Sequence, residues 1–248
     1  MEDVTIILSV YKRIYSFEEQ YAAIKRQTYP HIRTVIWINK ADNVNVSEEI
    51  LNNKESVYSE TNHGVWGRFR LAENYKSKYI CIIDDDTIPG SKWIENCINT
   101  IEKYPGVITT RGVVAKYGFD HLYPLPASYD AYGWANPKNS VTQVDMGCHS
   151  WFFERKLLED FWAYAPKEPP MNYGEDMHLS YVAQKNNLGT YVAPHPLDDI
   201  EMWGSDPKKG NEYGSDENAI SWSLEASRGM NKYWNYLRSH NFTILSEI

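Results

Sequence analysis

The sequence has few cysteines, no long apolar run and no cluster of basic residues. Its three cysteines, Cys81, Cys97 and Cys148, are odd in number and have no CxxC spacing, so neither a zinc site nor a disulfide framework is predicted. No apolar run approaches the roughly 20 residues of a membrane-spanning helix, and the first residues lack a signal peptide's basic region and cleavage site. We therefore expect a cytoplasmic protein, with peripheral contact to a membrane left open.

The charge and the size of the chain restrict its function further. The net charge is −8, and lysines and arginines are scattered, whereas a nucleic-acid-binding protein neutralises phosphates with clustered basic residues. With 248 residues, 42% of them hydrophobic, the chain is long enough to bury the core of one large domain. These features favour a single unit of the size of a catalytic domain.

Apolar strand-like segments alternate with amphipathic helical segments through the first half of the chain. This alternation predicts an α/β fold with a doubly wound, mostly parallel sheet, whose ligands bind outside the carboxyl ends of the strands. The predicted strands are residues 4–10, 34–39, 79–83 and 107–114, and the predicted helices are residues 17–27, 65–74 and 93–104.

The second half is less regular. Residues 116–140 are rich in Tyr, Pro, Gly and Asn, which indicates an irregular, aromatic-lined connection. Residues 141–153 are strand-like, and residues 157–161 and 177–187 have helical patterns. Residues 198–216 are rich in Gly, Asp and Lys and are expected to form a mobile loop before a last helix around residues 217–239.

Three adjacent carboxylates, Asp84, Asp85 and Asp86, follow the strand at residues 79–83. Their repulsion is relieved only by solvent, by a cation or by basic partners, so the alternatives are a solvated turn and a binding site. Because alternate residues of an extended segment point the same way, Asp84 and Asp86 are expected to converge on Mn²⁺ or Mg²⁺. Asp85 then points elsewhere, toward a basic neighbour or the substrate. Such a cation completes its coordination with water and phosphate, which makes a nucleotide diphosphate the natural ligand.

Several motifs together resemble a known family. They are the opening strand, Arg68 on the helix before the acidic triplet, the triplet within CIIDDDTIPGSKWIENC, and the later Gly174-Glu175-Asp176. Over roughly residues 4–195 the chain resembles nucleotide-sugar glycosyltransferases of the GT-A fold. It is most similar to family 2 and to the C-terminal transferase domain of exostosins. The resemblance implies a single metal-dependent domain that moves a sugar from a nucleotide diphosphate sugar to a hydroxyl of a glycan or other acceptor. Residues 1–115 would bind the donor and residues 116–248 the acceptor.

The resemblance also implies a catalytic base. Asp176 is expected to take the proton from the acceptor hydroxyl, with Glu175 beside it, although both carboxylates would also stabilise a helix N-terminus. A base on the face opposite the diphosphate inverts the anomeric configuration, whereas exostosin-type enzymes retain it, so both outcomes stay open.

Further donor contacts are expected at strand ends. Arg68 lies where related transferases carry a basic residue facing the donor, and the carboxylates of Asp84 and Asp85 are expected near the donor as well. Tyr11 and Arg13 after the first strand, and Asn39 with nearby Asp42 after the next, are expected at the base or ribose. Polar residues at strand ends also cap turns, which is the alternative.

Acceptor-side residues are expected in the segment QVDMGCHSWFF. Asp145 and Gly147 resemble the acceptor side of exostosin-like enzymes, His149 is expected to contact a sugar, and Trp151 to form a stacking floor. The alternative for His149 and Trp151 is a place in the core.

The C-terminal part adds a last set of candidates. His195 is a candidate for an additional metal ligand, because some GT-A enzymes use a C-terminal histidine there. Trp203, Lys208 and Lys209 lie in the predicted loop, which forms either a lid over the diphosphate or a plain surface loop.

Two other functions compete with this interpretation. One is a noncatalytic carbohydrate- or nucleotide-binding protein on the same fold. The other is a nucleotidyltransferase, which is disfavoured because LSVYKR is not the Gly-rich basic loop that such enzymes carry.

Overall fold

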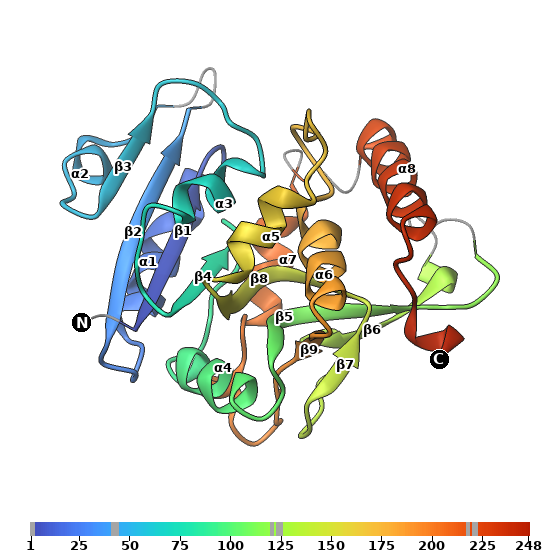
Figure 1. The fold of residues 1–248 in the computed structure, drawn as a ribbon. Helices are drawn as coiled ribbons and strands as arrows, with labels where there is room; N and C mark the ends of the chain where they lie inside the picture. Colours follow the sequence, from blue (N-terminus) through green and yellow to red (C-terminus); the bar gives the residue numbers. More distant parts are fainter. Residues whose placement is uncertain (1–2, 41–44, 120–121, 123–125, 217–218, 220–222) are drawn as a thin grey trace.

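The computed structural model describes residues 3–40, 45–119, 122, 126–216, 219 and 223–248, and Figure 1 shows its fold. Asp42 lies outside these residues. The strands are β1 Val4–Val10, β2 Ile32–Asn39, β3 Ser56–Ser59, β4 Tyr79–Ile83, β5 Gly106–Ala115, β6 Tyr129–Gly133, β7 Thr142–Val144, β8 Met146–Glu154 and β9 Gly189–Val192. The helices are α1 Phe17–Lys25, α2 Glu48–Leu51, α3 Gly67–Ala72, α4 Trp93–Ile101, α5 Leu157–Ala163, α6 Glu175–Lys185, α7 Pro207–Gly214 and α8 Leu224–Ser239.

All these strands belong to one sheet, in the order β3-β2-β1-β4-β8-β5-β9-β7, with β6 paired to β5. Strands β3, β2, β1 and β4 are parallel neighbours, and β5 pairs with β9 in parallel. Strand β8 runs antiparallel between β4 and β5, and β6 and β7 are also antiparallel to their neighbours. The prediction of an α/β fold with a mostly parallel sheet is therefore confirmed, with β8 inserted in the opposite direction.

Helices cover both faces of the sheet and create two cores. One core joins Ile80 and Ile82 of β4 to side chains of α3, α5, α6 and α8. The other joins Tyr79, Cys81 and Ile83 of the same strand to α1 and α4. A strand buried on both faces needs apolar residues at every position, which explains the unbroken apolar run before the acidic triplet.

The structure corrects the sequence prediction in the C-terminal part. Residues 198–216, predicted as a loop, contain the short 3₁₀ helix η3 (Ile200–Met202) and the helix α7. The last helix begins at Leu224, where the Ser223 hydroxyl caps it by accepting a hydrogen bond from the Ala226 amide. None of the described helices is long and apolar enough to cross a lipid bilayer. The three cysteines are free thiols.

Candidate functional site

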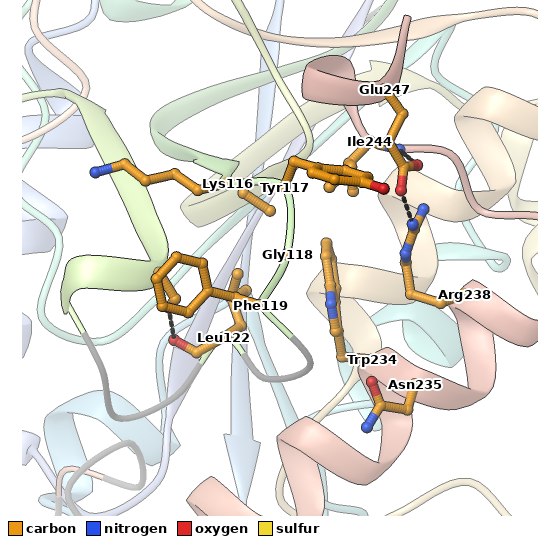
Figure 2. A pocket seen from close by; sticks show the side chains of 12 residues that line it. Lys116, Tyr117, Gly118, Phe119, Leu122, Trp234, Asn235, Arg238, Ile244 and Glu247 are labelled. Atoms are coloured by element: carbon orange, nitrogen blue, oxygen red, sulfur yellow. Dashed lines mark hydrogen bonds and ion pairs between the residues drawn. The ribbon is translucent and has the colours of Figure 1, made fainter.

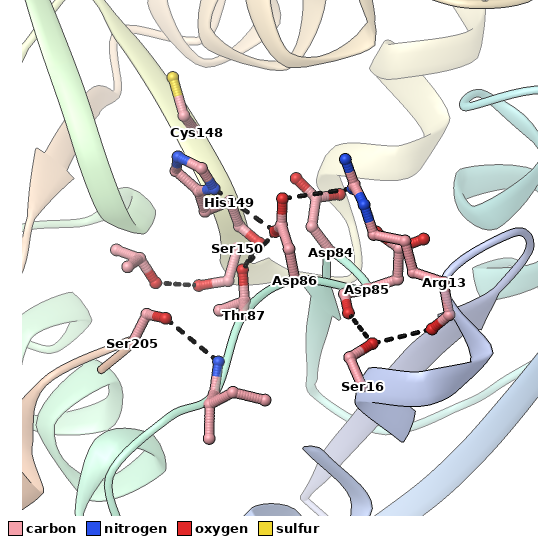
Figure 3. Close-up of polar contacts among 12 residues, drawn as sticks. Arg13, Ser16, Asp84, Asp85, Asp86, Thr87, Cys148, His149, Ser150 and Ser205 are labelled. Atoms are coloured by element: carbon pink, nitrogen blue, oxygen red, sulfur yellow. Dashed lines mark hydrogen bonds and ion pairs between the residues drawn. The ribbon is translucent and has the colours of Figure 1, made fainter. Parts of the chain in front are cut away.

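The acidic triplet lies at the carboxyl end of β4, where β8 and the end of β1 meet it (Figure 3). The Asp84 amide donates to the His149 carbonyl at 2.9 Å, which continues the pairing of β4 with β8. From α1, the Gln20 side-chain amide donates to the carbonyls of Asp84 at 2.6 Å and Thr87 at 2.9 Å. The backbone of the triplet is therefore fixed from two sides.

The side chains of Asp84, Asp86 and His149 converge. One ligand atom from each lies within 4.8 Å of the other two, and His149 Nδ1 is 3.6 Å from Asp86 Oδ1. Two carboxylates and an imidazole are a donor set that suits Mn²⁺, so these residues fit the divalent cation that the sequence predicts. The structure brings Asp84 and Asp86 together and adds His149, for which the sequence predicts contact with a sugar instead.

The backbone of His149 has an unusual conformation. Its φ is 70°, in the left-handed region that a residue with a Cβ rarely adopts. Its ring packs edge-on against Trp134, with ring centroids 5.0 Å apart. Conformations of this kind persist where the surrounding structure enforces them, often at functional sites.

Arg13 is bound to acidic side chains. Its guanidinium contacts Asp85 at 2.9 Å, Asp86 at 3.4 Å and Asp216 at 2.9 Å, and it is almost fully buried. In this conformation the donors of Arg13 are engaged by carboxylates, and its contact with the nucleotide base stays a prediction. The same contact shows the role of Asp85, which pairs with a basic neighbour, one of the two roles that the sequence predicts for it.

The surroundings shift the pKa values of Asp85 and Asp86 in opposite directions. Burial and the negative charge of Asp86 raise the pKa of Asp85, against the charge of Arg13. Burial would raise the pKa of Asp86 too, but His149, Arg13 and Thr87 outweigh it, and the pKa of Asp86 lies below its ordinary value. Asp86 is therefore held in the ionised form that a metal ligand needs.

Arg68 links the acidic triplet to the second acidic motif. From α3, its guanidinium pairs with Asp84 through one nitrogen and with Glu175 Oε1 through the other, the latter at 2.6 Å. The guanidinium also lies over the Trp151 ring, 4.6 Å from its centroid. Trp151 is buried and donates its indole N–H to the Gly147 carbonyl, so it supports Arg68 rather than forming a sugar-stacking floor.

Glu175 and Asp176 begin α6. Gly174 precedes them with φ 92°, and a Cβ on it would come within 2.8 Å of the Tyr233 ring. Glu175 is buried with Arg68, whereas Asp176 is half-buried and accepts a hydrogen bond from the Met177 amide at 2.7 Å. Burial and the charge of Glu175 raise the pKa of Asp176 to about 8. At neutral pH this carboxyl is largely protonated, so Asp176 becomes available to accept a proton as the pH rises toward 8.

A polar network occupies the ends of β1 and β2. The Asn62 amide donates to the Tyr11 hydroxyl at 3.0 Å, and the Asn39 amide donates to Asn62 Oδ1 at 2.9 Å. The His63 and Gly64 amides donate to the Asn39 and Asn62 side chains, at 2.9 and 2.8 Å. Tyr11 and Asn39 thus lie together at the carboxyl ends of β1 and β2, where the sequence predicts the nucleotide.

Two predicted acceptor residues have structural contacts instead. The buried Asp145 carboxylate accepts hydrogen bonds from the amides of Ala115 and Leu245, both at 2.7 Å, and burial raises the pKa of Asp145 to about 6. A Cβ on Gly147 would lie 2.8 Å from the Thr109 side chain, so the space beside Gly147 is filled by β5. This corrects the expectation that both residues face the acceptor.

His195 and Trp203 also belong to the interior. The His195 imidazole contacts the Ala193 carbonyl at 2.7 Å and the Gly204 amide at 3.3 Å, and burial lowers its pKa to about 4. Both ring nitrogens are thus committed to the backbone, which corrects the expectation of a metal ligand. Trp203 is buried against His195 and donates to the Pro196 carbonyl, so it is no lid residue in this conformation. Lys208 is exposed in the first turn of α7.

Helix α7 ends over the acidic triplet, a contact that the sequence does not predict. A Cβ on Gly214 would lie 2.8 Å from Asp86 Oδ2. Two residues later, Asp216 accepts hydrogen bonds from Arg13 and from the Tyr15 hydroxyl, the latter at 2.8 Å. Asp206-Pro207 was a detectable signal for the helix start, because Asp is a preferred N-cap and Pro is favoured in the first turn. No local pattern marks Asp216 as a partner of Arg13.

Comparisons with known proteins identify the class. Glycosyl transferase family 2 matches residues 5–162, and no curated protein sequence matches. Among solved structures, S. aureus TarS 1–349 is 15% identical over 94% of this chain and 77% of that chain, with a TM-score of 0.51. TarS 1–349 in complex with UDP-GlcNAc is 15% identical over 85% of this chain and 64% of that chain, also with a TM-score of 0.51. A longer TarS structure is 15% identical over 77% of this chain but only 36% of its own length, with a TM-score of 0.53.

The fold and the site together define a glycosyltransferase of the GT-A fold. The chain belongs to glycosyltransferase family 2, because that family matches more than half of its residues. The resemblance to family 2 and the prediction of a transferase are confirmed, while the likeness to exostosins stays a prediction.

Proposed function

We propose that this enzyme transfers a sugar from a nucleotide diphosphate sugar to a hydroxyl of a glycan acceptor, with inversion at the anomeric carbon. One observation carries the proposal: Arg68 joins the carboxylate cluster at the end of β4 to the acidic motif that begins α6. A site for the leaving diphosphate and a base for the acceptor are thereby held in one rigid unit. The UDP-GlcNAc complex of TarS makes UDP-sugars the first donors to test.

The proposed reaction is a single displacement at the anomeric carbon. Asp176 removes the proton of the acceptor hydroxyl, the acceptor oxygen bonds to the anomeric carbon, and the bond from that carbon to the diphosphate breaks. Asp84, Asp86 and His149 would hold a divalent cation, Mn²⁺ or Mg²⁺, which offsets the charge of the departing diphosphate. The nucleoside extends toward the carboxyl ends of β1 and β2, which carry Tyr11, Asn39 and Asn62. We also propose a cytoplasmic location for the enzyme.

The test measures nucleoside diphosphate release from UDP-GlcNAc, UDP-glucose, UDP-galactose and GDP-mannose, with Mn²⁺ or with EDTA. We expect release from at least one donor with Mn²⁺, and its loss with EDTA or in Asp86→Asn. Asp198→Asn, which changes an exposed carboxylate outside the cluster of Asp84, Asp86 and His149, is the matched control and should keep full activity. Release that persists in EDTA contradicts the metal assignment, and the absence of release from all four donors contradicts the donor class.

A second measurement separates the roles in the transfer step. Asp176→Asn is expected to abolish transfer to an acceptor, because an amide cannot accept the proton, while donor binding remains. NMR of the product reports the anomeric configuration, and a retained configuration would favour the exostosin-like mechanism over the inverting one.

A further inference from the structure

A cavity of about 330 Å³ lies beyond the C-terminal end of β5, separate from the acidic site (Figure 2). Its lining comes from the residues that follow β5, from α8 and from the C-terminal segment. Asp145 holds these walls together, because its carboxylate accepts the amides of Ala115 at the end of β5 and Leu245 near the C-terminus. Volumes of this size are at the lower end of those that hold small ligands.

The lining combines aromatic faces with free hydrogen-bonding groups. Tyr117 is 74% exposed and Phe119 43% exposed, which is unusual for large aromatic side chains. Figure 2 shows their rings and the Trp234 indole arranged around Gly118. Among the described residues, neither the indole N–H of Trp234, which is only 3% exposed, nor the exposed Asn235 amide has a hydrogen-bond partner. Aromatic faces beside free amide groups match the C–H faces and hydroxyls of sugar rings.

The charged groups of the cavity are already paired. Arg238 pairs with Glu247 and with the Phe242 carbonyl, and Lys116 pairs with Asp130 at 3.1 Å. An anionic ligand would have to break these pairs, whereas a neutral polyhydroxyl ligand leaves them intact. A lipid would leave the Asn235 amide and the indole N–H without partners, at a cost in desolvation.

The cavity and the acidic site both lie at the end of the sheet where β4 and β5 have their carboxyl ends. In the pairing of β5 with β8, Arg111 lies opposite Cys148, the neighbour of His149. Ala115, which lines the cavity, is four residues further along β5. Four strand residues span roughly 13 Å. A glycan of a few sugar units reaches over such a distance.

We propose that this cavity binds a neutral oligosaccharide and serves as a distal subsite for the glycan acceptor. The role in acceptor binding rests on the proposed function, whereas oligosaccharide binding itself does not. The site thereby selects acceptors by chain length, because only a chain long enough to reach it gains the additional contacts.

The experiment titrates the protein with maltohexaose, cellohexaose and chitohexaose and follows the Trp234 indole N–H by NMR, with Trp234→Phe to assign the signal. We expect that signal to move with at least one oligosaccharide, and Tyr117→Ala and Asn235→Ala to weaken binding about tenfold or more. Tyr58→Ala, which removes a tyrosine 53% exposed on β3, is the control and leaves binding unchanged.

Several outcomes would overturn the inference. They are a Trp234 signal that no oligosaccharide moves, an affinity unchanged in Tyr117→Ala, and a stronger response to inorganic phosphate or phosphatidylcholine vesicles. Binding of an oligosaccharide by a protein that turns over no nucleotide sugar would contradict the proposed function but not this site. Turnover without any response of Trp234 would contradict this site alone.

Discussion

Arg68 shows how one side chain unites two acidic motifs. It is buried, and it pairs at once with Asp84 at the end of β4 and Glu175 at the start of α6. Each carboxylate would be costly to bury alone, and the shared guanidinium compensates both. In this conformation Arg68 therefore positions the two motifs, and the donor-facing role expected from the sequence stays a prediction.

Replacing Arg68 with lysine is expected to reduce the turnover number at least roughly tenfold, because a single ammonium cannot bridge both carboxylates as the planar guanidinium does. Steady-state kinetics with saturating donor measure the effect, and the loss should be in kcat more than in KM. Arg70→Lys is the control, since Arg70 is exposed on the same helix and contacts Glu73 and the Trp162 ring rather than the acidic triplet. Equal activities of the two variants would show that Arg68 has no positioning role.

The raised pKa of Asp176 predicts a pH dependence of stability. The unfolded chain loses the Asp176 proton near pH 4, while the folded chain keeps it up to about pH 8. The stabilisation from this proton is therefore full below about pH 4 and is lost as the pH rises to about 8. Melting temperatures in EDTA between pH 5 and 8.5 should fall less steeply for Asp176→Asn than for the unmodified chain. Parallel curves would contradict the raised pKa.

At the scale of elements, α1, α4 and the strand β4 follow from local patterns, whereas α7 does not. The sequence PKKGNEYG of α7 contains two glycines and has low helix propensity. Tertiary contacts stabilise the helix, among them the Tyr213 hydroxyl with Glu19 on α1 and the end of α7 against Asp86. A helix stabilised by its neighbours gives a weak signal in its own sequence.

The turn after β4 depends on close packing at Gly90. Its amide donates to the Trp203 carbonyl at 2.9 Å, and a Cβ on Gly90 would lie 2.4 Å from the Glu201 carbonyl oxygen. Gly90→Ala is therefore expected to destabilise the fold by about 1–3 kcal/mol, through displacement of η3 from this turn. Urea unfolding measures it, and a midpoint within error of the unmodified chain would show that the contact relaxes without cost.

For the whole molecule, the antiparallel insertion of β8 determines the composition of the site. The register that pairs Ile83 with Ser150 places His149 beside the acidic triplet. The arrangement concentrates negative charge that Arg13 and Arg68 compensate only in part. Binding of a cation should therefore stabilise the folded chain as a whole.

Addition of Mn²⁺ is expected to raise the melting temperature by several degrees, since a ligand at 100 times its Kd adds about 2.7 kcal/mol to the free energy of unfolding. Differential scanning fluorimetry with and without EDTA measures the shift. Asp86→Asn should abolish most of it, and Asp198→Asn should keep it. A shift of the same size in both variants would place the cation elsewhere.

The sequence by itself determined the α/β architecture, the position of the acidic triplet at a strand end, and the convergence of Asp84 and Asp86. These features follow from local periodicity, which repeats within a few residues and is readable along the chain. The tertiary structure alone decided the partners: His149 beside Asp86, Arg13 and Asp216 around the triplet, and Arg68 between the two acidic motifs. It also turned Asp145 and His195 toward the backbone. Such contacts join residues tens of positions apart, and they depend on strand order and register, which no local pattern specifies.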